Sequence, residues 1–283
     1  MVINVIAVLH LILAMTIETS VALAGGSGSI IIAGNGSELG AIERLARAFE
    51  KAHLGTFVEI QWDEYQDPIA MVKAGDAHVA VAGRVDPSLA AIPIAWDGIA
   101  VVVYSGNPTK EVTTQQVAAI FSGQLKRWAE LNGQETAIQL IDRPANQNIR
   151  QTFESALGIA GQIPPSAQVI RSDQNALSTV AGNLSAVAYA SLKSALDAVK
   201  YGVDVSVLVI DRVEAAEETV KDGRYTLRRP VLLLSRKAPN PLADAFTVFA
   251  LSKEGQEIVA EMFTPYSSLA RRNPWQGENP NAR

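Results

Sequence analysis

The chain contains no cysteine, which excludes disulfide bonds, thiolate metal sites and a cysteine nucleophile at once. Its three histidines are His10, His53 and His78, and none has a second histidine three or four residues away, so a zinc site is not expected. A glycine-rich Walker loop is also missing, and no serine has a plausible histidine partner. We therefore expect a protein that is not an enzyme and that uses no metal and no cofactor.

Positive charge is neither abundant nor clustered. The formal net charge of the 283 residues is −5, and no run of lysine and arginine is present, with or without interleaved aromatic residues. Nucleic acid is therefore not an expected partner. Apolar residues make up 48% of the chain and charged residues 19%, so a buried core can form and disorder is not indicated. The length suits two interleaved lobes better than two independent domains with a linker.

Residues 1–24 have the pattern of an export signal. An apolar stretch from Val5 to Ile17 precedes Ala22-Leu23-Ala24, which is a small-x-small cleavage pattern. No lysine or arginine precedes the stretch, so an uncleaved anchor is the alternative, although His10 and Glu18 make the run short for a membrane span. Nothing later in the chain approaches that length. We predict a signal peptide that is cleaved and a periplasmic or otherwise extracytoplasmic location.

Short apolar runs alternate with amphipathic segments after the leader. Residues 30–33, 57–61 and 79–82 are typical of buried strands. Apolar residues at three- and four-residue steps predict a helix between the first two runs, ending at His53-Leu54-Gly55. Asp67-Pro68 predicts the start of a second helix. This β-α-β-α-β order predicts a parallel sheet with helices on both faces.

Two long apolar runs, Ile92 to Tyr104 and Tyr225 to Ser235, are predicted to cross between lobes in opposite directions. Ligands of parallel sheets bind outside the carboxyl ends of the strands. The loops at 34–37, 63–67 and 83–84 lie at that end of the first sheet. The other predicted elements are strands at 138–141, 187–189 and 205–210, and helices at 114–121, 147–157, 241–251 and 254–263.

Several motifs follow one another in a fixed order along nearly all of the chain after the leader. They are Trp96-Asp97-Gly98-Ile99 with Asn107-Pro108, Thr114 to Gly133 with Trp128, Arg143 with Arg150 and Phe153, Asp222-Gly223-x-Tyr225 with Arg229-Pro230, and Gly255-Gln256-x-Ile258-Val259. This order resembles the phosphate-binding-protein-like family of periplasmic solute receptors. Trp96 and Trp128 belong to these framework motifs, so we expect them to pack in the core or between lobes.

The resemblance implies a type II periplasmic-binding-protein fold, an α/β fold with two doubly wound lobes joined by two hinge crossover strands. Lobe 1 is then expected at residues 28–97 and 227–283, and lobe 2 at residues 98–226. The resemblance also implies that the protein delivers its ligand to the membrane subunits of an ABC transporter, and that the protein is a monomer. Closure of the lobes on the ligand is the expected mechanism.

The family's phosphate contacts are replaced in this chain. Its serine-glycine-threonine triplet corresponds to Gln147-Asn148-Ile149, and its second loop corresponds to Tyr65-Gln66-Asp67-Pro68. Its acidic residue, which accepts a proton from phosphate, falls near Gly83-Arg84. We expect phosphate or a related small oxyanion as ligand. The alternatives are a different small solute, and a sensory or interaction protein that kept the fold but lost phosphate binding.

The candidate ligand-binding residues lie at two helix starts and one loop. Helix starts carry unpaired N–H groups and partial positive charge, and arginine offers a forked donor to an oxyanion. The resemblance places an anion-binding arginine at Arg143, and Arg84 favours a fully ionised anion. The candidates are Asn35, Gly36, Ser37, Arg84, Arg143, Asn146, Gln147 and Asn148.

Each candidate also has a structural alternative. Ser37 can be an ordinary N-cap, Arg143 can pair with Asp142 or another acid, and Arg84 can be a solvated loop residue. Asparagine and glutamine at 146–148 can cap their own helix. Acids at 63, 64 and 67 near the same end of the sheet point to a ligand with an amine or hydroxyls, if they face the cleft.

Overall fold

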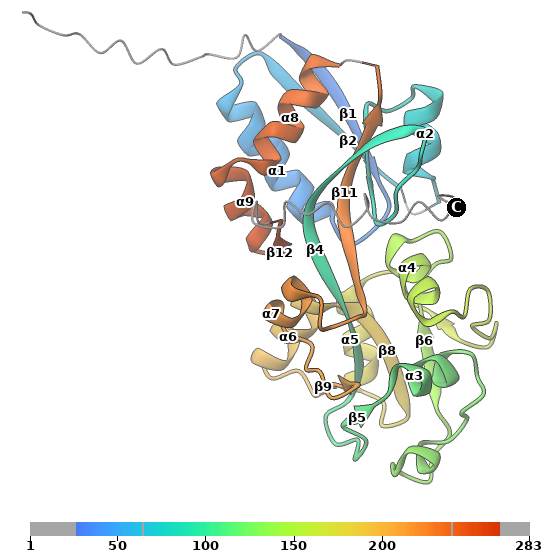
Figure 1. Cartoon of the computed structure of the whole chain (residues 1–283). Coiled ribbons are helices and arrows are strands. Elements are labelled where there is room, and N and C mark those ends of the chain that lie inside the picture. Colours follow the sequence, from blue (N-terminus) through green and yellow to red (C-terminus); the bar gives the residue numbers. More distant parts are fainter. Residues whose placement is uncertain (1–26, 64, 239, 267–283) are drawn as a thin grey trace, which may run out of the picture.

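A computed structural model describes residues 27–63, 65–238 and 240–266. The described chain forms two lobes, and two long strands run between them (Figure 1). These strands are β4 (Leu89–Tyr104) and β11 (Arg228–Arg236), and they pair antiparallel from Arg228 opposite Gly98 to Arg236 opposite Leu89. Both predicted crossings are present. The second begins as a strand only at Arg228, three residues later than the apolar run.

The first part of the chain folds as its periodicity predicts. Strand β1 (Gly28–Gly34) pairs parallel with both β2 (Thr56–Trp62) and β3 (Val79–Ala82). Helix α1 (Leu39–Ala52) buries its apolar stripe, and α2 (Pro68–Ala74) stops at a left-handed glycine. Strand β12 (Thr264–Pro265) adds to β4. Within the described residues the strand order is β2-β1-β3-β11-β4-β8-β6-β7.

Lobe 2 contains elements that the sequence pattern did not predict. Three helices lie where no helix was expected: α5 (Asp173–Ala181), α6 (Leu192–Lys200) and α7 (Glu217–Asp222). The expected strand at 205–210 is divided into β9 and β10, which join different sheets. The other elements are β5 (Glu111–Val112), α3 (Thr114–Phe121), a 3₁₀ turn (Trp128–Leu131), β6 (Gln139–Asp142), α4 (Asn148–Leu157), β7 (Gln168–Val169), β8 (Ala186–Ser191), β9 (Val205–Val207) and β10 (Val209–Ile210).

Two further helices complete the described chain. They are α8 (Pro241–Leu251) and α9 (Lys253–Ala260), which ends before the predicted Phe263. The chain leaves the helix there because Phe263 turns into the core of the first sheet and Thr264 pairs with β4. No helix in the described part of the chain is long and apolar enough to cross a membrane. The predicted signal peptide, residues 1–24, lies outside the described residues.

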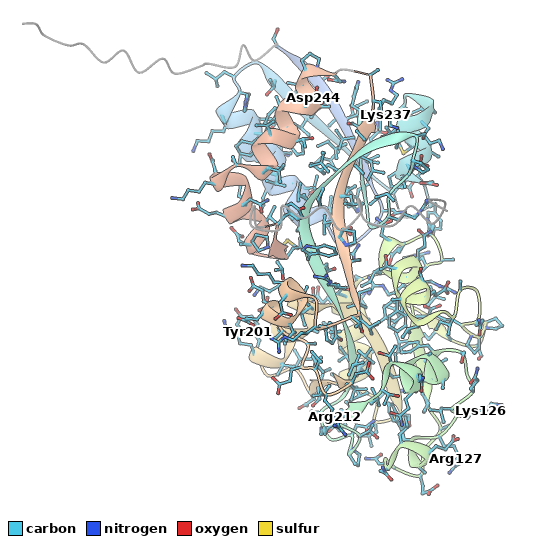
Figure 2. The ribbon with its side chains drawn as sticks, viewed as in Figure 1. Lys126, Arg127, Tyr201, Arg212, Lys237 and Asp244 are labelled. Carbon is cyan, nitrogen blue, oxygen red and sulfur yellow. The ribbon has the colours of Figure 1, made fainter. Side chains whose placement is uncertain are left out.

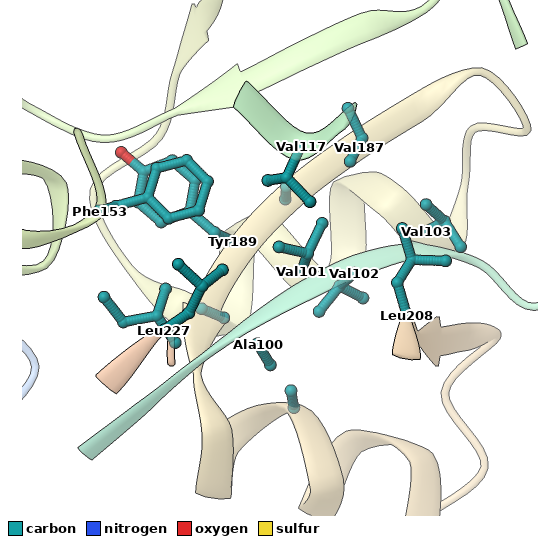
Figure 3. Close-up of a cluster of buried hydrophobic side chains, with 14 of the residues drawn as sticks. Ala100, Val101, Val102, Val103, Val117, Phe153, Val187, Tyr189, Leu208 and Leu227 are labelled. Carbon is teal, nitrogen blue, oxygen red and sulfur yellow. The ribbon is translucent and has the colours of Figure 1, made fainter. Parts of the chain in front are cut away.

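Buried apolar side chains form separate cores on the two sides of the crossing. One cluster draws only on residues 99–227, and two others draw only on residues 30–95 and 231–263. On this basis we propose a division into lobe 1 (28–97 and 228–266) and lobe 2 (98–227). In the lobe 2 core the rings of Phe153 and Tyr189 stack at 4.1 Å beside the valines of β4 (Figure 3). Trp128 is fully buried in the same core, as predicted.

Candidate ligand-binding site between the lobes

Three of the longer helices begin at the junction of the lobes without a side-chain cap. They are α1 of lobe 1, and α4 and α6 of lobe 2, with Glu38, Gln147 and Ser191 at their N-caps. Other helices are capped by the side chain of the preceding residue, namely α2, α3, α5, α8 and α9. An uncapped first turn leaves backbone N–H groups and partial positive charge available to an anion.

The turn between β1 and α1 faces lobe 2 across two hollows. Asn35 lines a hollow of about 50 Å³ together with Asn146 and Asn148 from the start of α4, and this hollow is called the interlobe cavity below. Ser37 lines another, of about 250 Å³, together with Ser191 from the start of α6. The two predicted turns therefore face each other, as a shared site requires.

Direct hydrogen bonds hold the lobes together at the interlobe cavity. The Asn35 side chain donates from Nδ2 to the carbonyl oxygens of Gln66, at 3.1 Å, and Asn146, at 2.9 Å. The Asn148 side chain donates from Nδ2 to the carbonyl oxygen of Val81, at 3.3 Å. Since the bonds to Asn146 and Val81 cross from one lobe to the other, the structure represents a closed arrangement.

Asn35 leaves one acceptor unused beside the cavity. Its side chain is 4% exposed, and its amide nitrogen lies between two carbonyl oxygens, which fixes the orientation of the amide. The other amide atom, Oδ1, is buried and has no hydrogen-bond partner. Buried polar atoms are normally paired, so this oxygen is suited to a hydrogen atom brought by a ligand.

Two opposite charges face the same cavity. Arg84 is half-exposed, and its Nη2 lies 4.0 Å from Oδ2 of Asp67. Asp67 is the N-cap of α2, as predicted. Its Oδ1 accepts a hydrogen bond from the backbone N–H of Ile69 at 2.9 Å. The loose ion pair leaves the guanidinium of Arg84 able to turn towards an anion.

Arg143 and Gln147 lie behind the cavity and do not line it. The Arg143 side chain is 2% exposed and contacts Oδ1 of Asp173 at 3.0 Å, the carbonyl oxygen of Arg171 at 2.7 Å and Oε1 of Gln147 at 3.2 Å. The acid that pairs with Arg143 is Asp173, whereas Asp142 pairs with Arg150 at 2.9 Å. In this geometry Arg143 and Gln147 fix the shape of the loop before α4, and the prediction that they contact the ligand is not supported by their positions.

Ser37 and Gly36 take part in contacts that the sequence did not predict. The N-cap of α1 is Glu38, and Ser37 instead accepts a hydrogen bond at Oγ from Nη2 of Arg229, at 3.0 Å. The Glu38 carboxylate folds over Gly36, where a Cβ atom would collide with it. Glycine is therefore needed at position 36 for the carboxylate of Glu38 to reach Arg229.

A buried ionic network crosses the hinge beside these residues. Arg229 of β11 is fully buried, forms an ion pair with Glu38 and donates to Oδ2 of Asp97 from two nitrogens, at 2.8 and 3.1 Å. Ser191 of lobe 2 donates from Oγ to Oδ1 of Asp97 at 2.7 Å. The network thus joins α1 of lobe 1, both crossover strands and the start of α6.

Burial and charge shift the pKa values of this network in opposite directions. Burial raises the pKa of Asp97 to about 6, although Arg229 and Ser191 oppose the rise. Burial alone would lower the pKa of Arg229, but the carboxylates of Glu38 and Asp97 hold that pKa above its ordinary value. Asp97 and Arg229 belong to the sequence motifs named above, but the sequence did not predict what they do. Glu38 was not predicted to take part, because its partner Arg229 is distant in the sequence.

A family model described as a PBP superfamily domain matches residues 19–254. The phosphate-binding protein PstS of Pseudomonas aeruginosa is 28% identical over 194 residues, which are 60% of this chain and 58% of that protein. The phosphate-binding protein PstS 2 of Streptococcus agalactiae is 33% identical over 112 residues, which are 38% of each chain. The chain thus matches less than two thirds of the length of these curated relatives.

Solved structures match over more of the chain. A putative phosphate ABC transporter substrate-binding protein from Clostridium perfringens, with bound phosphate, is 28% identical with a TM-score of 0.75, covering 85% of this chain and 100% of that one. An ABC-type phosphate transport receptor from Vibrio cholerae is 25% identical with a TM-score of 0.74, covering 82% and 98%. These names describe binding and transport and no catalysis, in agreement with a protein that is not an enzyme. The chain therefore belongs to the PBP superfamily, within its phosphate-binding-protein-like branch, and has the type II periplasmic-binding-protein fold.

Proposed function

We propose that this protein is an extracytoplasmic solute-binding protein of an ABC transporter, and that it binds phosphate or a related small oxyanion in the interlobe cavity. The observation that carries the proposal is the meeting, at one cavity, of Asn35 from the turn before α1 in lobe 1 with the uncapped start of α4 in lobe 2. Such starts stabilise anions through backbone N–H groups and the helix dipole. The named relatives support phosphate as the first ligand to test.

The size of the interlobe cavity suits a small tetrahedral anion. Its volume is about 50 Å³, and a cavity needs only ~10–15 Å³ to hold one water molecule, so a group larger than a single water can enter it. Phosphate and its analogues have five heavy atoms. A larger ligand, such as a sugar, would have to extend beyond the interlobe cavity.

The polar groups around the cavity favour an anion that still carries a proton. Arg84 supplies a donor, and Oδ1 of Asn35 supplies an unpaired acceptor. The sequence alone suggested a fully ionised ligand, because the family's acid is replaced by Arg84; the acceptor on Asn35 changes that expectation. Hydrogen phosphate offers both acceptors and one O–H donor, whereas sulfate has no proton to donate at neutral pH. We expect phosphate to bind more tightly than sulfate.

Isothermal titration calorimetry of the full chain with phosphate and with sulfate tests this function. Arg84→Gln removes a charge-assisted hydrogen bond worth ~1.5–3 kcal/mol, so we expect phosphate affinity to fall by about tenfold or more. Lys126→Gln is the matched control, because Lys126 is exposed at the end of lobe 2 that is farthest from lobe 1 (Figure 2). Like Arg84→Gln, this control removes one positive charge, and it should leave the affinity for phosphate unchanged.

Two outcomes would contradict the proposal. Absence of heat with millimolar phosphate, while circular dichroism shows a folded protein, removes phosphate from the candidate ligands. Equal affinities for the wild type and Arg84→Gln show that the anion binds elsewhere. A ligand with an amine or hydroxyls is the second candidate, because Asp67 places a carboxylate in the cavity wall. If the ligand is of this second kind, the titration with phosphate should give no heat of binding.

A further inference from the structure

A larger hollow adjoins the interlobe cavity and is not filled by a phosphate-sized ligand. This groove has a volume of about 560 Å³ and is lined by residues of the crossover strands and of α4. Helix α4 is the lobe 2 helix whose start contacts lobe 1 (Figure 1). Arg84, Asn148 and Gln151 line both the groove and the interlobe cavity. The two spaces therefore meet at these three side chains.

The lining of the groove has the character of a site for an organic molecule. Trp96, Pro230 and Ala156 supply apolar surface, and Thr152 and Ser155 supply hydroxyl groups along one side of α4. Pockets for small organic ligands typically measure ~300–1,000 Å³ and are mostly apolar with a few polar groups. A volume of about 560 Å³ falls within that range.

Charge in the groove is positive. The guanidinium of Arg228 lies over the ring of Trp96, 4.2 Å from its centroid, and Nη1 of Arg228 donates to the carbonyl oxygen of Val220 at 2.6 Å. Arg84 lies at the junction with the interlobe cavity. None of the described residues that line the groove is acidic. Both a guanidinium and an indole ring favour contact with a planar group.

We infer that the ligand is an organic phosphonate or phosphate monoester. Its phosphoryl head occupies the interlobe cavity, and its apolar body, preferably aromatic, occupies the groove beside Trp96 and Arg228. The inference rests on the proposed anion site and adds the chemical class of the rest of the ligand. Because Arg84, Asn148 and Gln151 line both spaces, we expect the apolar group to be bonded to phosphorus either directly or through a single ester oxygen.

Calorimetry with inorganic phosphate and with phenylphosphonate tests the inference on the full chain. We expect phenylphosphonate to bind at least tenfold more tightly than phosphate, because its ring leaves water for the groove. Ala156→Trp fills the groove from an exposed position on α4 and does not line the interlobe cavity. In this variant phosphate affinity is expected to be unchanged, and the advantage of phenylphosphonate to be lost. Ser155→Tyr repeats the test at the adjacent groove position if Ala156→Trp folds poorly.

The matched control is Ala160→Trp, the same substitution at an exposed residue beyond α4 that does not line the groove. It should keep the full preference for phenylphosphonate. If phosphate binds as tightly as phenylphosphonate to the wild type, the inference is overturned while the proposed function stands. If neither ligand binds, both fail. Binding of phenylphosphonate without binding of phosphate supports the inference.

Discussion

Replacing Arg229 by methionine is expected to destabilise the protein strongly. The guanidinium is fully buried between Glu38 and Asp97, whose side chains are each 1% exposed. Methionine fills similar space but leaves two buried carboxylates without their cation. Removing one partner of a buried ion pair typically costs ~3–5 kcal/mol, and the loss falls on two acids here, so we expect about 5 kcal/mol. That is a large part of the ~5–15 kcal/mol that stabilises an ordinary domain.

Urea unfolding at pH 7, followed by circular dichroism, measures this loss. Arg44→Met is the matched control, because Arg44 pairs with Glu261 on the surface and both side chains are 53% exposed. Exposed pairs contribute ~0–1 kcal/mol, so the control should remain close to the wild type. A loss in Arg229→Met that is no larger than in Arg44→Met would refute the claim that Arg229 neutralises the buried acids.

The pH dependence of unfolding gives a second measure of the same network. The pKa of Asp97 rises from 3.8 to about 6 on folding, so between these values the folded state holds a proton that the unfolded state has lost. The contribution of Asp97 to stability is therefore full below pH 4 and declines as pH rises towards 6. Without Arg229 the pKa of Asp97 is higher still. The deficit of Arg229→Met should therefore be larger at pH 8 than at pH 5; a deficit independent of pH would contradict this.

Three further substitutions test other parts of the structure. Asp67→Asn keeps an N-cap acceptor for α2 and removes a negative charge from the interlobe cavity, so calorimetry should show unchanged folding and anion affinity increased by up to about fivefold. Tyr189→Phe removes the 2.7 Å hydrogen bond to the buried carboxylate of Asp142, so the free energy of unfolding in urea should fall by about 2 kcal/mol. Tyr201 is 76% exposed, and Tyr201→Phe should leave the free energy of unfolding unchanged. In Gly83→Val the new Cβ would lie 3.2 Å from a hydroxyl of α4 when the lobes are closed. Overpacking costs ~1–3 kcal/mol, so anion affinity should fall about tenfold. An unchanged affinity would show that closure does not bring these surfaces together.

Local chemistry was sufficient to predict most of lobe 1. Asp67-Pro68 and Gly75 set the ends of α2 through a side-chain cap and a left-handed glycine, which act within one helical turn. Apolar periodicity set α1, and the run at 79–82 became β3 with every residue buried. Alternation of these elements then required parallel pairing, since a helix connects each strand to the next.

Lobe 2 shows where local patterns are insufficient. Helix α6 begins directly after the last residue of β8, and no side chain caps it, so nothing in the sequence marks its start. Helix α5 is capped by Ser172, but it has only nine residues and a partly polar inner side, including the buried Asp173. Its position is set by Arg143, 30 residues earlier, which the sequence could not pair with it.

The sequence by itself determined the fold, because strand and helix periods, caps and turns depend on neighbours within a few residues, and the order of its motifs matched one family. It also predicted that the turns at 34–37 and 143–148 face each other, and Asn35 and Asn146 of these turns meet at the interlobe cavity. Only the tertiary structure decided what each side chain does there. Arg143 is used inside lobe 2, Asn35 beside the cavity keeps a buried oxygen without a hydrogen-bond partner, and Arg229 pairs with Glu38, 191 residues away. Such pairings depend on which charges become buried together, and desolvation makes each buried charge find a partner that no local pattern specifies.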